Sequence, residues 1–309
     1  MKLLSVKVPC YNEQETIEDF YAEFDKVVPY FQEKSVDIEI LFIDDGSKDK
    51  TVDEIKKLCE KDTKVRMISF SRNFGKEAAI YAGLEKSEGD YVVIMDADLQ
   101  DPPALLPQMY ELVEEGYESV ATRRVSRKGE PFVRSCFAKM FYSLMRKISK
   151  ADIVDGARDY RLMTRKFVNA VLKISEYNRF TKGIFGWVGF ETKWIAYENI
   201  ERKKGKTKWS FWKLLLYSIE GIVGFSTAPL AFASVVGMLF CILAFLFLVF
   251  IFARALIFGD PVAGWPSTIC IILMVSGVQM FCIGIMGQYL AKTYLEVKHR
   301  PIYVVDEEV

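Results

Sequence analysis

The chain has 309 residues, which is long enough for one large domain or two smaller ones. Lysine plus arginine equals aspartate plus glutamate at 41 each, so the overall charge gives no indication of a nucleic-acid partner. The six cysteines form no C-x-x-C pair, and the single histidine, His299, lies near the end of the chain. These counts argue against a disulfide framework, a zinc site and a histidine-based catalytic triad, and they are typical of a reducing compartment.

Short apolar runs alternate with helical patterns over residues 1 to about 125. The runs expected to form strands are 3–8, 36–43, 65–70, 91–95 and 119–122. Between them, apolar residues recur at helical spacing over 17–31, 52–58, 78–84 and 104–113. This alternation predicts an α/β fold with a mostly parallel, Rossmann-like sheet and helices on both faces. Ligands of such sheets bind beyond the carboxyl ends of the strands, so polar clusters after the first, second and fourth strands should converge.

Residues 126–210 have a more mixed pattern. Within them, residues 132–148 place apolar side chains on one broad helical face, with four basic residues among them. These are Arg134, Lys139, Arg146 and Lys147. Two interpretations are open: a helix that packs on the core with a solvated basic face, and a helix that lies on an anionic membrane surface.

Two long uncharged segments follow, residues 221–253 and 261–291. Each exceeds the roughly 20 apolar residues that span a bilayer, and only Arg254 and Asp260 are charged between them. We therefore expect a helical hairpin through a membrane. Basic residues lie on its outer sides: Arg202, Lys203, Lys204, Lys206, Lys208, Lys213, Lys292, Lys298 and Arg300.

The positive-inside rule then predicts that both termini and the N-terminal domain are cytoplasmic, in a multi-pass protein of the inner membrane. The predicted parts are a domain over 1–209, a juxtamembrane interfacial helix over 210–228, two transmembrane helices within 229–291, and a cytoplasmic tail over 292–309. The two transmembrane helices are expected at about 230–253 and 266–291.

Asp96-Ala97-Asp98 follows the expected strand over 91–95. A D-x-D triplet is weak evidence by itself, and a solvated turn leading into Pro102 is the plain alternative. Two carboxylates one residue apart at the end of a buried strand would repel each other unless a cation lies between them. A hard divalent ion such as Mg²⁺ or Mn²⁺ prefers oxygen ligands and often shares them with substrate phosphates, and Gln100 could add a further oxygen.

Two further clusters close the first and second strands. They are Val8-Pro9-Cys10-Tyr11-Asn12-Glu13 and Asp44-Asp45-Gly46-Ser47. An aromatic ring can stack on a nucleobase and a carboxylate can accept from an imide N–H, so the three clusters together predict a pocket for a nucleotide and a metal. The rival phosphate-binding motifs are absent: no G-x-G-x-x-G occurs, and Ile200 stands where a P-loop ending at Thr207 would need glycine.

Four ordered segments resemble the motifs of one enzyme family. They are Pro9-Cys10-Tyr11-Asn12-Glu13, Asp44-Asp45-Gly46-Ser47, Ser71-Arg72-Asn73-Phe74-Gly75-Lys76 and Asp96-Ala97-Asp98-Leu99-Gln100-Asp101-Pro102. The family is that of the inverting family-two glycosyltransferases with a GT-A fold. The resemblance is strongest to the polyprenyl-phosphate branch, which includes dolichyl-phosphate mannose synthases and bactoprenol glucosyltransferases, and it covers nearly all of the chain.

The resemblance implies a role for each matching position. The nucleotide contacts would be Pro9, Tyr11, Glu13, Asp44, Asp45, Lys76, Asp96 and Ala97, with Tyr11 and Asp45 at the nucleobase. The metal ligands would be Asp96, Asp98 and Gln100, holding Mg²⁺ or Mn²⁺. The catalytic residues would be Asp159, Asp98, Arg124 and Arg127, with Glu130 in the same acceptor-side loop as the two arginines. The lipid phosphate would bind Arg202, Lys208 and Arg124. In the family's Gly-Asp-Phe-Arg-Leu segment the sequence departs from the pattern, because Ala157-Arg158 stand between Gly156 and Asp159.

The implied reaction transfers a hexose from a nucleotide-diphosphate sugar, UDP-glucose or a related UDP-sugar, to polyprenyl (undecaprenyl) phosphate for cell-envelope glycosylation. A single displacement without a covalent enzyme intermediate would invert the anomeric centre. A phosphomonoester has a second pKa of about 6, so the acceptor is largely ionised at neutral pH and Asp159 would orient substrates more than remove a proton. The resemblance to this branch also implies that the protein forms a homo-oligomer, such as a tetramer.

Two rival functions remain open from the sequence. A processive polysaccharide synthase would carry a Gln-x-x-Arg-Trp segment and more membrane helices, neither of which the sequence has. A catalytically silent membrane scaffold is the rival that is not an enzyme, and the intact acidic motifs argue against it.

Overall fold

The computed structural model describes residues 2–124, 154, 156–197, 221–224, 226–258 and 264–309. The strands are β1 Lys2–Cys10, β2 Val36–Asp44, β3 Val65–Phe70, β4 Tyr91–Ile94, β5 Ser119–Arg124, β6 Ala157–Thr164, β7 Thr192–Tyr197 and β8 Val305–Glu308. The helices are α1 Ile17–Asp25, α2 Val28–Glu33, α3 Thr51–Lys61, α4 Lys76–Glu85, α5 Leu106–Glu114, α7 Arg165–Leu172, α8 Thr181–Trp187, α10 Ala228–Phe258 and α11 Trp265–Val297, and a 3₁₀ turn, η1, covers Pro103–Leu105.

All eight strands form one mixed sheet in the order β7-β5-β6-β4-β1-β2-β3-β8. The pairs β1/β2, β1/β4, β2/β3 and β5/β7 are parallel, whereas β6 runs antiparallel to β4 and β5. The predicted α/β fold with a mostly parallel sheet is therefore confirmed. Because β1, β2 and β4 run in the same direction, the segments that follow their carboxyl ends meet at one edge of the sheet.

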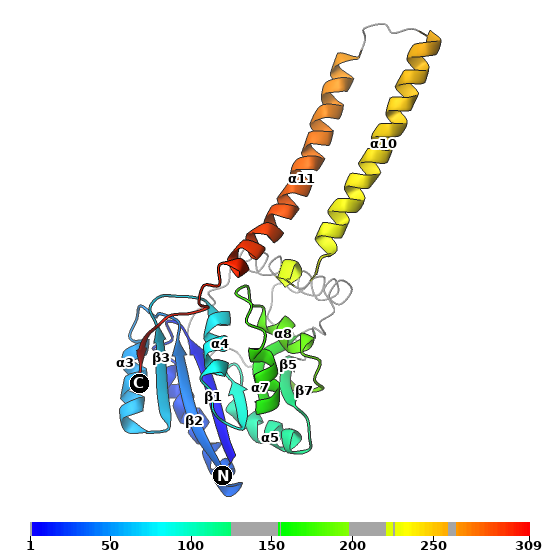
Figure 1. The fold of residues 1–309 in the computed structure, drawn as a ribbon. Coiled ribbons are helices and arrows are strands. Elements are labelled where there is room, and N and C mark those ends of the chain that lie inside the picture. The colour runs from blue at the N-terminus through cyan, green and yellow to red at the C-terminus, as the bar shows by residue number, and fades with distance from the viewer. Residues whose placement is uncertain (1, 125–153, 155, 198–220, 225, 259–263) are drawn as a thin grey trace.

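Helices cover both faces of the sheet (Figure 1). One face packs against α1, α2, α3 and α5 through apolar residues that include Phe20, Phe31 and Ile55. The other face packs against α4, α7 and α8 through residues that include Leu84 and Phe167. Burial of these faces is the main stabilising term of such a layered domain.

The helical pattern over 17–31 forms two helices rather than one. α1 ends at Asp25, and α2 starts at Val28 with Pro29 in its first turn. Proline has no N–H to donate to the preceding turn, but it fits the first turn of a new helix. The apolar spacing continues across the break because both helices bury the same side.

α10 and α11 lie side by side and extend well away from the sheet domain (Figure 1). The stretches that qualify as membrane spans are Ala228–Phe247 and Met274–Val297, with mean hydropathies of 2.7 and 1.3 and only 6% and 0% of their residues buried. The core helix of a soluble protein would instead be covered by the rest of the chain. Both helices are long and apolar enough to cross a membrane, and they leave a large apolar surface uncovered.

The last residues return from the end of α11 to the sheet domain, where β8 pairs antiparallel with β3 and forms the edge of the sheet. Tyr303 stacks on Phe70 at a centroid distance of 4.9 Å, and its hydroxyl donates to Glu85 at 2.6 Å. Glu308 pairs with Arg66 at 3.2 Å and with Lys86 at 3.1 Å. The residues expected to form a tail thus cover an edge that would otherwise expose unpaired backbone groups.

We predict that Tyr303→Ala lowers the free energy of unfolding of the detergent-solubilised protein by about 1–3 kcal/mol, because it removes a half-buried ring from its stack on Phe70. Thermal unfolding would measure the change. Tyr303→Phe is the matched control, since it keeps the ring and loses only the hydroxyl bond to Glu85. Equal melting temperatures for Tyr303→Ala and the wild type would show that the ring does not hold the C-terminal strand in place.

Candidate active site

The loop after β1 is braced against the loop after β2. Asn12, whose φ of 51° lies in the left-handed region, donates its backbone N–H to Ser47 Oγ at 2.8 Å and accepts from Lys48 N at 2.8 Å. The N–H of Glu13 donates to Thr51 Oγ1 at 2.9 Å. These bonds fix the backbone on either side of the side chains expected at the nucleotide.

Three of the expected nucleotide residues lie on this first loop. Pro9 is buried within β1, and Tyr11 and Glu13 are half-buried just beyond it. The register of β1 with β2 pairs Cys10 with Asp44, so Tyr11 directly follows the strand end next to Asp45. The structure therefore brings the first and second motifs together, as the parallel arrangement predicted.

Asp44 and Asp45 have different local partners. Asp44 is fully buried and accepts from Ser69 Oγ at 2.8 Å and from Ser47 N at 3.2 Å. Asp45 is 4% exposed and accepts from the backbone N–H groups of Phe74 at 2.6 Å and of Gly75 at 3.0 Å. Asp44 therefore shapes its own turn, whereas Asp45 joins the second motif to the third.

Gly46 allows these two loops to approach closely. Its φ is +67°, and a Cβ at this position would lie 2.4 Å from the carbonyl carbon of Arg72. No other residue type fits both the left-handed backbone and this contact. The glycine in Asp44-Asp45-Gly46-Ser47 is thus required by the packing of the segment over 71–75.

The acidic motif forms a strained turn after β4. Leu99 has a φ of 57°, which is costly for a leucine, and its side chain is 7% exposed in the core. Asp98 is 7% exposed and accepts from the backbone N–H of Gln100 at 3.1 Å, and Ala97 is buried. Burial of Leu99 holds the turn in a conformation that keeps Asp96 and Asp98 at the edge of the sheet.

Lys76 connects the third and fourth motifs to Asp159. Its Nζ lies 2.8 Å from the Asp96 carboxylate and 2.7 Å from Asp159 Oδ2, and Lys182 Nζ lies 3.7 Å from Asp159 Oδ1. Burial opposes ionisation of Asp159, but the two lysines outweigh it and hold the pKa of this carboxyl well below its usual range. Burial raises the pKa of Asp96 despite Lys76, and the charge of Asp159 acts in the same direction as burial.

Arg158 organises the other side of the acidic turn. Its guanidinium donates to Asp101 Oδ1 at 3.1 Å, to the Tyr197 hydroxyl at 3.2 Å and to Gln100 Oε1 at 3.3 Å. The hydroxyl of Tyr197 in turn donates to Asp101 Oδ1 at 2.5 Å. Arg158 thus ties β6 and β7 to the motif that follows β4.

β6 contains a bulge opposite β5. Ala121 faces Arg161 and Arg123 faces Ala157, so two steps along β5 match four steps along β6. The extra residues bring Arg158 and Asp159 to the acidic turn. Asp159 therefore lies close to Asp96, and Lys76 bridges the two carboxylates.

The acidic residues fit a hard divalent cation shared with a substrate. Within the described ranges, no three or more His, Cys, Asp or Glu side chains are arranged to hold a metal ion. Mg²⁺, however, commonly takes only one or two protein carboxylates together with phosphate oxygens. The charges of Asp159, Asp101 and Asp98 all raise the pKa of Asp96 alongside its burial, so added positive charge beside Asp96 would be stabilising.

The structure locates only part of the expected acceptor side. Arg124 is the last residue of β5, in register with Tyr197. Arg127, Glu130, the helix expected over 132–148, Arg202, Lys208 and residues 210–220 of the expected interfacial helix lie outside the described residues.

Four residues of the site were not singled out from the sequence: Asp101, Arg158, Lys182 and Tyr197. Asp101 belongs to the acidic motif and could have been assigned from its position there. Arg158 was noticed only as part of an insertion. Lys182 and Tyr197 lie in segments without a recognised motif. Tyr197 is brought close by the pairing of β7 with β5, and Lys182 follows Thr181, which is bonded to Glu77 of α4.

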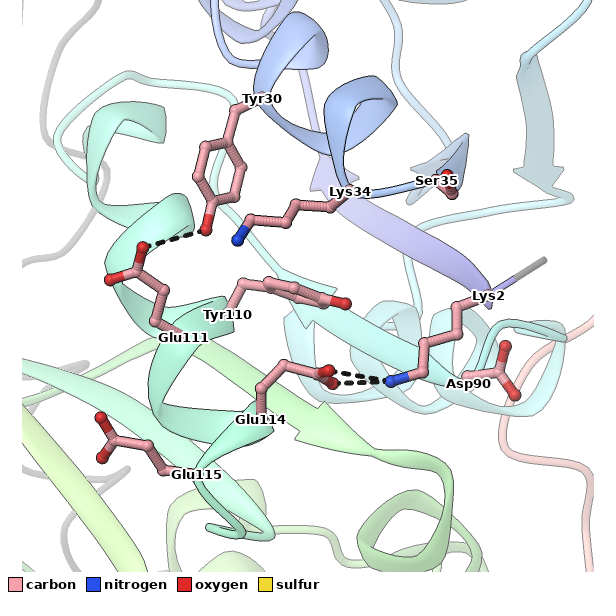
Figure 2. Close-up of a pocket in the computed structure, with 9 residues that line it drawn as sticks. All are labelled: Lys2, Tyr30, Lys34, Ser35, Asp90, Tyr110, Glu111, Glu114 and Glu115. Atoms are coloured by element: carbon pink, nitrogen blue, oxygen red, sulfur yellow. Dashed lines mark hydrogen bonds and ion pairs between the residues drawn. The ribbon is translucent and has the colours of Figure 1, made fainter.

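A cavity of about 730 Å³ lies at the opposite end of the sheet (Figure 2). Its lining includes Lys2, the first residue of β1, and Asp90, which precedes β4. The rings of Tyr30 and Tyr110 also line it. The Lys2 ammonium pairs with the Glu114 carboxylate across one side. None of the described residues expected at the substrates lines this cavity.

The chain belongs to the glycosyl transferase family 2, whose family model matches residues 5–172. It is thus a glycosyltransferase with a GT-A fold, and the resemblance found in the sequence is confirmed.

Among its relatives is the putative glycosyltransferase CsbB of Bacillus subtilis, 43% identical over 99% of this chain and 92% of that protein. The bactoprenol glucosyl transferase of Shigella phage SfV is 40% identical over 99% of this chain and 98% of its own length. A crystal structure of glucosyl-3-phosphoglycerate synthase from Mycobacterium tuberculosis is similar at 20% identity, covering 72% of this chain and 78% of that one with a TM-score of 0.47.

We predict that Asp45 makes the free energy of unfolding depend on pH. Burial raises the pKa of this carboxyl from 3.8 to about 6, with Asp44 acting in the same direction and the N–H groups of Phe74 and Gly75 opposing. Because the folded pKa exceeds the unfolded one, the stabilisation by the bound proton is fully present below about pH 4 and is lost as the pH rises through 6. The free energy of unfolding of the wild type, relative to Asp45→Asn, should therefore fall by up to about 3 kcal/mol between pH 4 and 7.

Chemical denaturation of both proteins across this pH range would measure the difference. Asp53→Asn, at an exposed position on α3, controls for the loss of a carboxylate in general. A difference between wild type and Asp45→Asn that stays constant with pH would contradict the raised pKa.

Proposed function

We propose that the protein transfers a hexose from a nucleotide-diphosphate sugar, a UDP-sugar such as UDP-glucose, to polyprenyl phosphate with inversion at the anomeric carbon. The product would be a lipid-phosphate-linked sugar for cell-envelope glycosylation. The observation that carries the proposal is the acidic turn beside the loops after β1 and β2, in a domain joined to two uncovered apolar helices. Relatives named bactoprenol glucosyl transferases, which match over nearly the whole chain, support the choice of acceptor.

The donor would bind along the carboxyl edge of the sheet. Tyr11 is half-buried and Asp45 is fixed by the backbone of Phe74 and Gly75, which suits a site for a flat, hydrogen-bonding base. Asp96 and Asp98 would hold Mg²⁺ or Mn²⁺ together with the diphosphate. The bound cation would supply charge neutralisation for the leaving nucleoside diphosphate. Gln100 Oε1 accepts from Arg158, so it would reach the cation only if that bond opened.

Asp159 suits an orienting role better than that of a strong base. Lys76 and Lys182 keep this carboxylate ionised, and the lysines outweigh the effect of its burial on the pKa. A carboxylate with such a low pKa is a weak proton acceptor. The phosphate acceptor needs little deprotonation at neutral pH because its second pKa is about 6. Asp159 would therefore align the sugar or the acceptor phosphate for in-line displacement.

The acceptor would arrive from the bilayer in which α10 and α11 lie. Both helices expose apolar side chains along the stretches that could cross a membrane, and lipid would cover this surface. By charge asymmetry, both termini and the catalytic domain would face the cytoplasm. Arg124, Arg127, Arg202 and Lys208 would offset repulsion between the lipid phosphate and the sugar nucleotide.

Purified protein mixed with Mg²⁺, undecaprenyl phosphate and radiolabelled sugar nucleotides tests the activity. We expect one sugar per lipid in the organic phase, with highest yield from UDP-glucose or a related UDP-sugar, and a β-linkage by NMR from an α-linked donor. Label that never enters the organic phase for any donor would favour a silent scaffold. A product that lengthens with time would favour a processive synthase.

The acidic turn is tested by Asp96→Ala and Asp98→Ala. We expect each to lower transfer by at least about 100-fold, because the leaving diphosphate loses its main charge stabilisation. Asp37→Ala, at an exposed position on β2, is the matched control and should transfer at the wild-type rate. Circular dichroism and membrane fractionation would verify that each variant folds and inserts, and wild-type turnover in a folded Asp96→Ala or Asp98→Ala protein would refute the metal assignment.

A further inference from the structure

Lys182 is a cation at the site that no sequence motif indicated. It lies in the first turn of α8, and its side chain is 25% exposed. Its Nζ is 3.7 Å from Asp159 Oδ1 and 3.1 Å from the carbonyl oxygen of Ala157. Lys182 therefore flanks Asp159 from α8, whereas Lys76 reaches the same carboxylate from α4.

The start of α8 is tied to the start of α4 by a single carboxylate. Glu77 accepts from the backbone N–H of Thr181 at 2.8 Å and also from the Thr181 hydroxyl. Glu77 follows Lys76, and Lys182 follows Thr181. The two lysines are thus attached to one rigid junction, which fixes both of them around Asp159.

The segment before α8 is also tied to the membrane helix α11. The Glu296 carboxylate accepts from Tyr177 N at 3.1 Å, from Asn178 N at 3.0 Å and from Asn178 Nδ2 at 3.2 Å. α11 runs from this junction away from the sheet domain (Figure 1). Lys182 therefore lies four residues from a contact with the helix that leads into the membrane and at the same time contacts the candidate catalytic carboxylate.

Lys76 and Arg158 form shorter ion pairs in the site than the one between Lys182 and Asp159. Lys76 lies at 2.7 and 2.8 Å from two carboxylates, and Arg158 lies at 3.1 Å from Asp101. At 3.7 Å, the ion pair of Lys182 with Asp159 is the longest of these, and a phosphate oxygen that approached Lys182 more closely would compete with it effectively.

We propose that Lys182 binds a phosphate group of a bound substrate beside Asp159. The inference rests on the proposed transfer reaction, in which two phosphate-bearing anions must meet beside a cluster of carboxylates. A lysine ammonium offsets that repulsion and donates charge-assisted hydrogen bonds to phosphate oxygens. The phosphate has two possible sources, the donor diphosphate and the lipid phosphate, and the two arms of the experiment separate them.

The test compares Lys182→Met, Lys182→Arg and Lys166→Met with the wild type. Lys166 is an exposed lysine of α7 that pairs with Glu118 on the surface, so Lys166→Met repeats the chemical change away from the site. One arm titrates each protein with UDP and with GDP by calorimetry in the presence of Mg²⁺. The other arm measures KM and kcat for undecaprenyl phosphate in detergent micelles, and thermal unfolding verifies that each variant is folded.

We expect Lys182→Met to weaken phosphate binding by about tenfold or more in one arm, Lys182→Arg to recover most of it, and Lys166→Met to match the wild type. Weaker nucleotide binding identifies the donor diphosphate, and a raised KM for the lipid with unchanged nucleotide binding identifies the lipid phosphate. A fall in kcat alone, or no change in either arm, would overturn the inference and leave Lys182 as a support for Asp159. Wild-type protein that transfers no sugar would refute the proposed function itself, which is a separate outcome.

Discussion

The site depends on one ion contact, the bridge that Lys76 forms between Asp96 and Asp159. Four aspartates, Asp96, Asp98, Asp101 and Asp159, gather where the sheet ends, and carboxylates this close destabilise one another unless cations lie among them. Lys76 joins carboxylates that follow β4 and lie on β6, so neutralising the charge also fixes the relative positions of the two segments. A buried ion pair adds little net stability compared with apolar packing, but loss of Lys76 would leave two carboxylates without their shared cation.

The same charges bear on how a divalent cation would bind beside Asp96. Lys76 contacts Asp96 at 2.8 Å, on the carboxylate where a divalent cation is proposed to bind. If Asp96 held a divalent cation together with the donor diphosphate, that cation would repel Lys76, which would remain attracted to Asp159 and to the phosphates. Lys182 lies on the other side of Asp159, with its Nζ 3.7 Å from Oδ1. Asp159 is thus kept ionised by two lysines that reach it from α4 and α8.

Much of the fold could be predicted from the sequence because local patterns determine it. The first five strands alternate with apolar helical faces, and the motifs after β1, β2 and β4 converge because those strands are parallel. The antiparallel strand β6, its two-residue bulge and the edge strand β8 could not be predicted in the same way. Their positions depend on pairing with segments that are distant in the sequence, which no local spacing encodes. β8, near the end of the chain, pairs with β3, which lies in its first quarter.

The residues of the candidate site likewise fall into those that local patterns predict and those that they do not. Asp45, Asp96 and Asp98 follow strands and belong to motifs, so their convergence could be expected. Tyr197 enters the site through β7, Lys182 through α8 and Arg158 through the bulge, so their positions depend on tertiary contacts that local spacing does not encode. Residues that carry charge to a site from unpatterned segments are the ones that sequence spacing cannot reveal.

Two attachments join α11 and the residues after it to the sheet domain. Glu296 binds the segment before α8, and a few residues later the chain pairs with β3 at the far edge of the sheet. A helix joined to a domain at one point can pivot, whereas two separated attachments remove that freedom. If α10 and α11 span the membrane, the carboxyl edge of the sheet is therefore held at a fixed height above the lipid surface. A lipid phosphate has little freedom to leave that surface, so transfer to it requires an active site that is held there as well.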